Sequence, residues 1–318
     1  MITEQIWHGE TVHILENDKL SITLCPAINN NLIRIWDKTL EREVLRVPDD
    51  PAALRANPAH FGTPILMPPN RIIGGAFTFD GRPYQFLINR PNNMHNHGVL
   101  QALPWKVKQV HEDQEVISIT STFRTFDHPV VMEQFPHDFE LEVTYELVGS
   151  TLNHKVKATN YSELKAPFGY GLHTWFLLDH KPQDWKFTLP VSGIWELGSD
   201  LMPTGQILPL GELQGLPEGI SLKGTDFDTV FHIGNEEYPH VATLEDDRCI
   251  IRYSAPSDKF KHWVIYTKGE ADNFICAEPY TWVTNAPNVP RDAELTGIIG
   301  IPSGESIELD ILLDISYK

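Results

Sequence analysis

The feature that most constrains the fold of this chain is a strict alternation of apolar and polar residues in several stretches. Between residues 139 and 147 the apolar residues Phe139, Leu141, Val143, Tyr145 and Leu147 alternate with Glu140, Glu142, Thr144 and Glu146. Residues 307–315 alternate in a similar way, with Glu308, Asp310 and Asp314 between the apolar positions. A period of two places the apolar side chains on one face of a β-strand and the charges on the other.

Similar shorter runs occur at 11–24, 115–124, 152–159 and 241–253, and turn-forming residues separate them, as at 68–70, 80–81 and 303–304. Helical patterning is scarce. Residues 50–56 predict one short helix with Asp50 as N-cap and Pro51 in the first position, ending before Pro58. The sequence therefore predicts an all-β fold, a large antiparallel β-sandwich with few short helices.

No linker, low-complexity tract or solenoid-like repeat divides the 318 residues, so we expect a single domain over 1–318. Residues 1–5 lack the basic and apolar regions of a signal peptide, which favours a cytoplasmic protein. The three cysteines, Cys25, Cys249 and Cys276, are far apart in sequence and show neither metal-ligand spacing nor a disulfide framework.

The charge balance of 25 basic against 43 acidic residues gives a net charge of −18. An acidic surface repels phosphate backbones and anionic lipid, so we expect no nucleic-acid partner and no membrane partner. No apolar stretch approaches the roughly 20 residues that span a bilayer. The balance also favours a neutral small-molecule substrate over a phosphorylated one, although a local basic pocket would override it. Monomer and homodimer remain open.

Polar residues within apolar or turn-rich segments are the candidates for chemistry. Arg71 follows Asn70 and a double proline, where stiff backbone would hold its guanidinium to donate two hydrogen bonds to vicinal hydroxyls. The alternative is a structural ion pair. Residues 89–98 hold four asparagines and two histidines, which excludes a strand core or a helix and indicates a polar loop able to carry function.

Histidines and acidic residues give further candidates. His95 and His97 suggest a metal pair by spacing, but no third ligand lies nearby, and we expect no metal. His173 lies in a glycine-bearing aromatic run, either as a core residue or as a general acid with a pKa tuned by burial. Glu278 ends an apolar stretch just before Pro279, where a buried carboxylate needs partners or a function. Asp228 is a weaker acidic candidate.

Taken together, the segments resemble the aldose 1-epimerase (galactose mutarotase) family in order and rough spacing from about residue 60 to the end. The resemblance rests on Asn70-Arg71-Ile72, Gly75-Ala76-Phe77, Gly81, Tyr84, Asn89, His97-Gly98, Gly171-Leu172-His173, Asp228-Thr229-Val230-Phe231, Glu278-Pro279-Tyr280 and Asn285-Ala286. Thr174-Trp175 stands where the family has Pro-Tyr, and Val99 where it often has a second glycine, so the identity of the sugar stays open.

The resemblance implies a galactose mutarotase-like supersandwich with a site in a cleft on one sheet. It implies Glu278 as general base, His173 as general acid and His97 assisting at the ring oxygen of a sugar. Arg71 and Asp228 would hold hydroxyls, with Asn70 beside them, and Trp175 or Trp282 would supply an apolar wall. The choice of His97 over His95 rests on the following Gly98.

The activity so implied is an isomerase reaction, the interconversion of the α and β anomers of a free aldose. A base takes the proton of the anomeric hydroxyl, an acid protonates the ring oxygen, and the ring opens and closes on either face. No cofactor is needed. One rival is a hexose-6-phosphate 1-epimerase, which would use basic residues such as Arg71, Arg82 and Arg90. Another is a non-catalytic carbohydrate-binding protein, although binding alone needs no acid–base pair.

Overall fold

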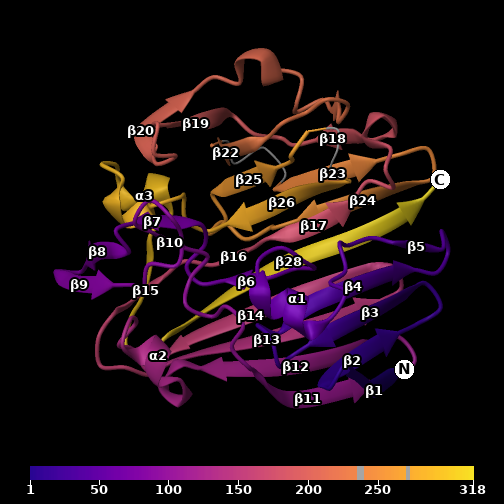
Figure 1. Cartoon of the computed structure of the whole chain (residues 1–318), viewed down its shortest axis with the longest axis horizontal. Coiled ribbons are helices and arrows are strands. Elements are labelled where there is room, and N and C mark those ends of the chain that lie inside the picture. Colours follow the sequence, from indigo (N-terminus) through magenta and orange to yellow (C-terminus); the bar gives the residue numbers. More distant parts are fainter. Residues whose placement is uncertain (235–239, 270–272) are drawn as a thin grey trace.

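The computed structural model describes residues 1–234, 240–269 and 273–318, and these residues form antiparallel sheets (Figure 1). The largest sheet has nine strands. In spatial order they are β11 (Lys106–Glu112), β12 (Ile117–Arg124), β13 (Phe139–Val148), β14 (Thr151–Asn160), β28 (Ser306–Tyr317), β24 (Cys249–Ser254), β23 (Val241–Glu245), β18 (Lys186–Thr188) and β21 (Ile220–Ser221).

The second sheet has eight strands and carries most of the site described below. Its order is β20 (Pro203–Leu208), β19 (Gly193–Leu197), β22 (Asp228–His232), β25 (His262–Tyr266), β26 (Phe274–Tyr280), β16 (Gly171–Leu172) and β6 (Ile65–Leu66), and β17 (Thr174–Leu177) also pairs with β26. A five-stranded sheet comprises β1 (Ile2–Trp7), β2 (Glu10–Glu16), β3 (Leu20–Cys25), β4 (Asn31–Asp37) and β5 (Arg42–Glu43).

The remaining elements are short. Three two-stranded ribbons pair β7 (Arg71–Ile73) with β10 (Met94–Asn96), β8 (Ala76–Phe79) with β9 (Arg82–Gln85), and β15 (Ala166–Phe168) with β27 (Ile299–Ile301). The helices are α1 (Pro51–Ala56), α2 (Pro129–Met132) and α3 (Ala293–Thr296), with 3₁₀ turns at Thr125–Asp127, Pro182–Asp184, Gly211–Leu213 and Ala286–Asn288. None of the helices in the described residues has the length and apolar character needed to cross a bilayer.

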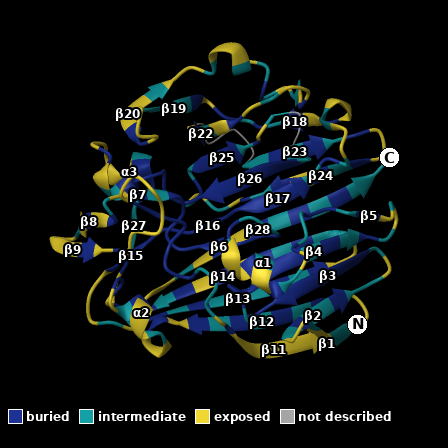
Figure 2. Ribbon diagram, viewed as in Figure 1, coloured by how far each residue is buried: buried dark blue, intermediate teal, exposed yellow. Residues whose placement is uncertain are grey.

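The nine- and eight-stranded sheets face each other across one core. The hydroxyls of Thr174 on β17 and Tyr253 on β24 lie 2.8 Å apart and join the two sheets. Nε2 of His154 on β14 lies 2.6 Å from the hydroxyl of Tyr170, just before β16. Apolar side chains of both sheets and of the five-stranded sheet belong to one buried cluster, and the central strands are the most buried parts of the molecule (Figure 2). The predicted β-sandwich is confirmed.

The alternating stretches form strands where they were predicted. Along β13 the side chains alternate between buried and partly exposed, and the apolar residues of β28 face the core in the same way. The shorter runs contain β2, β3, β12, β14, β23 and β24. Helix α1 begins at Pro51, and the Asp50 side chain accepts a 2.7 Å hydrogen bond from the backbone N–H of Ala53, as an N-cap does.

Two local predictions were wrong. Residues 94–96 were assigned to a loop, but they form β10, which pairs with β7 and is fully buried. One of its polar side chains has a backbone partner there, since Nδ1 of His95 lies 2.7 Å from the carbonyl oxygen of Leu87. Glu278 does not end its strand, since β26 continues through Pro279 to Tyr280.

Candidate active site

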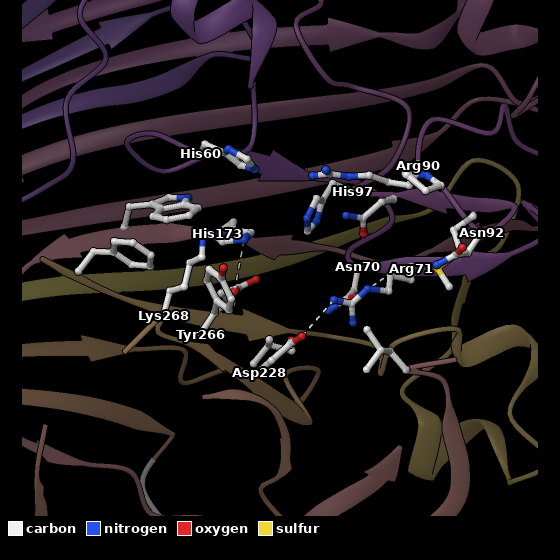
Figure 3. Close-up of a pocket in the computed structure, with 18 of the residues that line it drawn as sticks. His60, Asn70, Arg71, Arg90, Asn92, His97, His173, Asp228, Tyr266 and Lys268 are labelled. Carbon is white, nitrogen blue, oxygen red and sulfur yellow. Dashed lines mark hydrogen bonds and ion pairs between the residues drawn. The ribbon is translucent and has the colours of Figure 1, made fainter. Parts of the chain in front are cut away.

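A cleft of about 630 Å³ opens above the face of the eight-stranded sheet that carries Glu278 (Figure 3). Its walls come from segments far apart in the sequence. Strands β7, β10, β17, β22, β25 and β26 contribute side chains, together with the loops around residues 46, 60 and 90–92. The lining includes all seven residues predicted for a site: Asn70, Arg71, His97, His173, Trp175, Asp228 and Glu278.

Strand register places His173 opposite Glu278. Gly171 pairs with Tyr280, and Thr174 pairs with Ala277, so the same antiparallel register sets His173 against Glu278 between them. The backbone N–H of His173 donates to the carbonyl of Pro64 at 3.1 Å, on the side of β6. Pro279 has no N–H to donate to a neighbouring strand, and β16 ends just before His173 while β17 begins just after it.

The two side chains form a buried pair. His173 Nε2 lies 3.4 Å from Glu278 Oε1. Only 1% of Glu278 and 7% of His173 are exposed, so solvent does little to screen their interaction. The hydroxyl of Tyr280, two residues along the same face of β26, donates to the other carboxyl oxygen of Glu278. This carboxyl therefore has partners on both oxygens, as a buried acidic group requires.

Burial shifts the two pKa values in opposite directions. It raises the pKa of Glu278 to about 8, and the hydrogen bond from Tyr280 and the charge of Arg71 counteract this only in part. Burial also lowers the pKa of His173 to about 3, with a smaller contribution from His60. Desolvation penalises the charged form of each group. At neutral pH the free pair therefore holds one dissociable proton, and that proton lies on Glu278.

His97 lies against His173 and is held by its backbone. The two imidazole rings meet edge to face with centroids 5.2 Å apart. His97 adopts a left-handed conformation with φ of 64°, and its N–H donates to the carbonyl of Asn70 at 3.0 Å. Asn70 is itself left-handed, and its side-chain oxygen accepts the N–H of Arg71 at 2.8 Å. Burial, followed by the charge of His173, lowers the pKa of His97 well below its usual value.

Arg71 and Asp228 meet across the cleft. Arg71 Nη2 lies 3.4 Å from Asp228 Oδ2, joining β7 to the first residue of β22. Arg71 thus makes an ion pair, the structural alternative considered for it, and the partner in that pair is Asp228, the other residue expected to hold hydroxyls. The two side chains are 21% and 44% exposed, so this pair contributes little to stability and both groups can reach a ligand.

Of the two tryptophans considered for an apolar wall, Trp175 lines the cleft. Its ring stacks on that of His173 with centroids 5.0 Å apart and planes 3° from parallel, and its Nε1–H donates to the carbonyl of Ala59 at 2.7 Å. Trp282, the other tryptophan considered for this role, lies in the core. Its Nε1–H donates to the carbonyl of Pro69 at 3.1 Å, and it does not line the cleft.

His95 does not join the site. Its Nδ1 lies 2.7 Å from the carbonyl oxygen of Leu87, and its ring packs against Phe86, so it does not converge with His97. The described residues do bring one trio of possible metal ligands together: His173, Cys276 and Glu278 offer atoms within 4.8 Å of one another. Burial raises the pKa of the Cys276 thiol well above its usual value, and a protonated thiol is a poor ligand.

Four polar or charged lining residues were not singled out from the sequence: Arg46, His60, Tyr266 and Lys268. Arg46 and His60 come from segments beside α1 with no motif of their own. Tyr266 lies on the face of β25 that carries Val264, which pairs with Glu278, so knowledge of strand pairing would have found it. Of the three arginines considered for a phosphate, Arg71 and Arg90 line the cleft, whereas Arg82 lies in the β8–β9 hairpin.

Comparison with known proteins agrees with this architecture. The family model described as aldose 1-epimerase matches residues 31–313. An uncharacterized protein, YihR, from Escherichia coli K12 is 25% identical over 236 residues, which cover 72% of each chain. Galactose mutarotase from Sus scrofa is 27% identical over 160 residues, covering 48% of this chain and 43% of the relative.

A crystal structure of a galactose mutarotase-like protein from Clostridium acetobutylicum superimposes with a TM-score of 0.94, at 24% identity, over 100% of this chain and 99% of the other. The likeness extends over the whole fold, including every strand that lines the cleft. Since the family model also covers most of the sequence, the chain belongs to the aldose 1-epimerase family.

Proposed function

We propose that this protein is an aldose 1-epimerase that interconverts the α and β anomers of an aldose in the cleft. The observation that carries the proposal is the buried pair of His173 and Glu278, 3.4 Å apart at the floor of a cleft large enough for a pyranose. In the proposed reaction Glu278 takes the proton of the anomeric hydroxyl and His173 protonates the ring oxygen. The C1–O5 bond breaks, and the C1–C2 bond then rotates.

Ring closure reverses both proton transfers. The hydroxyl oxygen formed from the ring oxygen attacks the aldehyde carbon, its proton returns to His173, and Glu278 returns a proton to the anomeric oxygen. Protons and electrons balance over the cycle, so the reaction as written needs no cofactor. Each proton transfer by a positioned side chain contributes about 10²–10⁴-fold to the rate.

These roles require the single proton of the pair to lie on His173 when the sugar is bound. In the free cleft burial keeps it on Glu278, whose pKa is about 8. A bound sugar changes this balance, because hydroxyls that donate to a carboxylate stabilise its charged form. The Tyr280 hydroxyl and the Arg71 charge already act in the same direction. Transfer of the proton over the 3.4 Å between the two side chains then gives the reactive ion pair.

The other lining residues orient the sugar. Arg71 and Asp228 offer donors and acceptors to hydroxyls on one side of the pair, with Asn70 next to them. His97 lies against His173 and assists at the ring oxygen. Trp175 lines the cleft beside His173 and offers apolar aromatic surface to the C–H groups of the pyranose.

Polarimetry of freshly dissolved α-D-glucose or α-D-galactose tests the proposal. We expect the protein to accelerate the approach to the equilibrium rotation, and His173→Asn to lower kcat by at least about 10²-fold. A non-catalytic carbohydrate-binding protein on this fold would bind sugars without changing the rate. Equal mutarotation by wild type and His173→Asn would place the acid elsewhere.

A further inference from the structure

The cleft is basic although the chain is acidic. Four cationic side chains line it, namely Arg46, Arg71, Arg90 and Lys268, against two carboxyls, Asp228 and Glu278. Asp228 is paired with Arg71, and Glu278 is protonated at neutral pH because its pKa is about 8. Among the described residues no carboxylate makes an ion pair with Arg46, Arg90 or Lys268. The cleft thus has positive charge that its own residues do not neutralise.

Arg46 is the best positioned of these cations. Its guanidinium lies over the rings of Phe61, Trp175 and Phe274, 5.0, 5.1 and 5.6 Å from their centroids. Stacking against aromatic faces fixes the plane of a guanidinium while its N–H groups remain free at the edge. No side-chain hydrogen bond from Arg46 to another described residue accounts for those donors. A guanidinium held in one plane in this way can donate two parallel hydrogen bonds to an oxyanion.

His60 and Arg90 line the same cleft as this guanidinium. Burial lowers the pKa of His60, and the charges of Arg90 and Arg46 lower it further. The His60 ring also contacts that of Trp175, with centroids 5.6 Å apart. Figure 3 shows His60, Arg90 and His97 along one side of the pocket, and Asp228, Tyr266 and Lys268 along the other.

We propose that Arg46, with Arg90 and His60 beside it, forms an oxyanion subsite, so that the aldose turned over here carries an anionic substituent. Trp175 connects the subsite to the acid–base pair, since its ring contacts both Arg46 and His173. In this arrangement an anion on C6 of the pyranose would be directed toward Arg46 while C1 stays near Glu278. The inference rests on the proposed epimerase reaction. The expectation of a neutral substrate rested on the negative net charge of the whole chain. The cleft itself is basic, so that expectation does not apply to it.

The test compares D-glucose, D-glucuronate, D-glucose 6-phosphate and D-glucose 6-sulfate by polarimetry at low ionic strength. We expect kcat/KM for at least one anionic sugar to exceed that for glucose by about tenfold or more. The preferred anion distinguishes a carboxylate from the two tetrahedral esters. A kcat/KM for glucose equal to or above that of all three anionic sugars would overturn the inference, although the epimerase proposal would stand.

Single substitutions test whether the preference for an anionic sugar depends on Arg46 and Arg90. Arg46→Gln should remove most of the preference for the anionic sugar, and Arg90→Gln, at an exposed position, should reduce it. Arg252→Gln is the matched control, because it removes the same charge from an exposed position on β24, outside the cleft. An equal loss of preference in Arg252→Gln, or none in Arg46→Gln and Arg90→Gln, would refute the subsite.

Calorimetric binding of methyl β-D-glucuronide and methyl β-D-glucoside separates this inference from the proposed function, since methyl glycosides have no anomeric hydroxyl and cannot mutarotate. Tighter binding of the glucuronide, lost in Arg46→Gln, would support a carboxylate in the subsite. The same binding result without any acceleration of the mutarotation of free sugars would support the subsite and contradict the proposed epimerase activity. Binding of the two glycosides with equal affinity, together with no preference for either ester in polarimetry, would overturn the subsite.

Discussion

Replacing Glu278 by glutamine should lower the activity and raise the stability of the protein. The carboxyl is the proposed base, and its burial destabilises the fold at pH values where it is ionised in the unfolded chain. The substitution preserves the shape of the side chain and a hydrogen-bond acceptor near His173, but it removes the basic group. If Glu278 accepts the anomeric proton, kcat should fall by at least about 10²-fold. Polarimetry with saturating sugar measures this loss.

The stability effect follows from the shift in pKa. The pKa of Glu278 rises from 4.5 to about 8 on folding. Between these values the folded protein holds a proton that the unfolded chain has lost, so the free energy of unfolding decreases as pH rises. Each pKa unit corresponds to about 1.4 kcal/mol, and the accumulated penalty is about 3 kcal/mol at pH 7. Glutamine does not titrate and escapes this penalty.

This effect is best measured as the pH dependence of the difference in free energy of unfolding between Glu278→Gln and the wild type. Urea unfolding at pH 6 and pH 8 should show the advantage of Glu278→Gln growing by about 2 kcal/mol, whatever the effect of the amide on packing. His173 is neutral in both proteins over this range, since its pKa is about 3. A difference that stays constant between pH 6 and pH 8 would refute the raised pKa. Near-wild-type kcat would refute the role of Glu278 as the base.

Three further outcomes are expected. The kcat/KM should stay level from pH 6 to about 7 and decline above about 8, where the pair loses its one proton; a rate that rises from pH 7 to pH 9 would show that the free carboxylate alone is the active form. Arg71→Ala should raise KM more than it lowers kcat, because hydroxyl contacts act in ground and transition states alike, and an unchanged KM in a folded variant would assign Arg71 a structural role. Dialysis against EDTA should leave mutarotation intact; loss of activity that a divalent ion restores would indicate a metal held by groups such as His173 and Glu278.

The class of fold and most residues of the candidate site could be predicted from the amino-acid sequence. The two-residue period of residues 139–147 and 307–315 allows an apolar face only in an extended strand, and β13 and β28 follow. The short motifs around Arg71, His97, His173, Asp228 and Glu278 named the side chains that converge in the cleft, because each combines a polar group with an apolar or turn-rich setting that would otherwise disfavour it.

Features that depend on pairing between distant strands could not be predicted from the sequence. The opposition of His173 and Glu278 follows from the register of β26 with β16 and β17, and no local pattern encodes a register between residues more than 100 positions apart. The sequence also could not show which of His173 and Glu278 holds the single proton, because this depends on desolvation by the whole fold. The basic lining of the cleft was masked by the net charge of −18, because a sum over the chain carries no information on where charges gather. Arg46 reaches the cleft only because folding stacks it on Trp175 and Phe274.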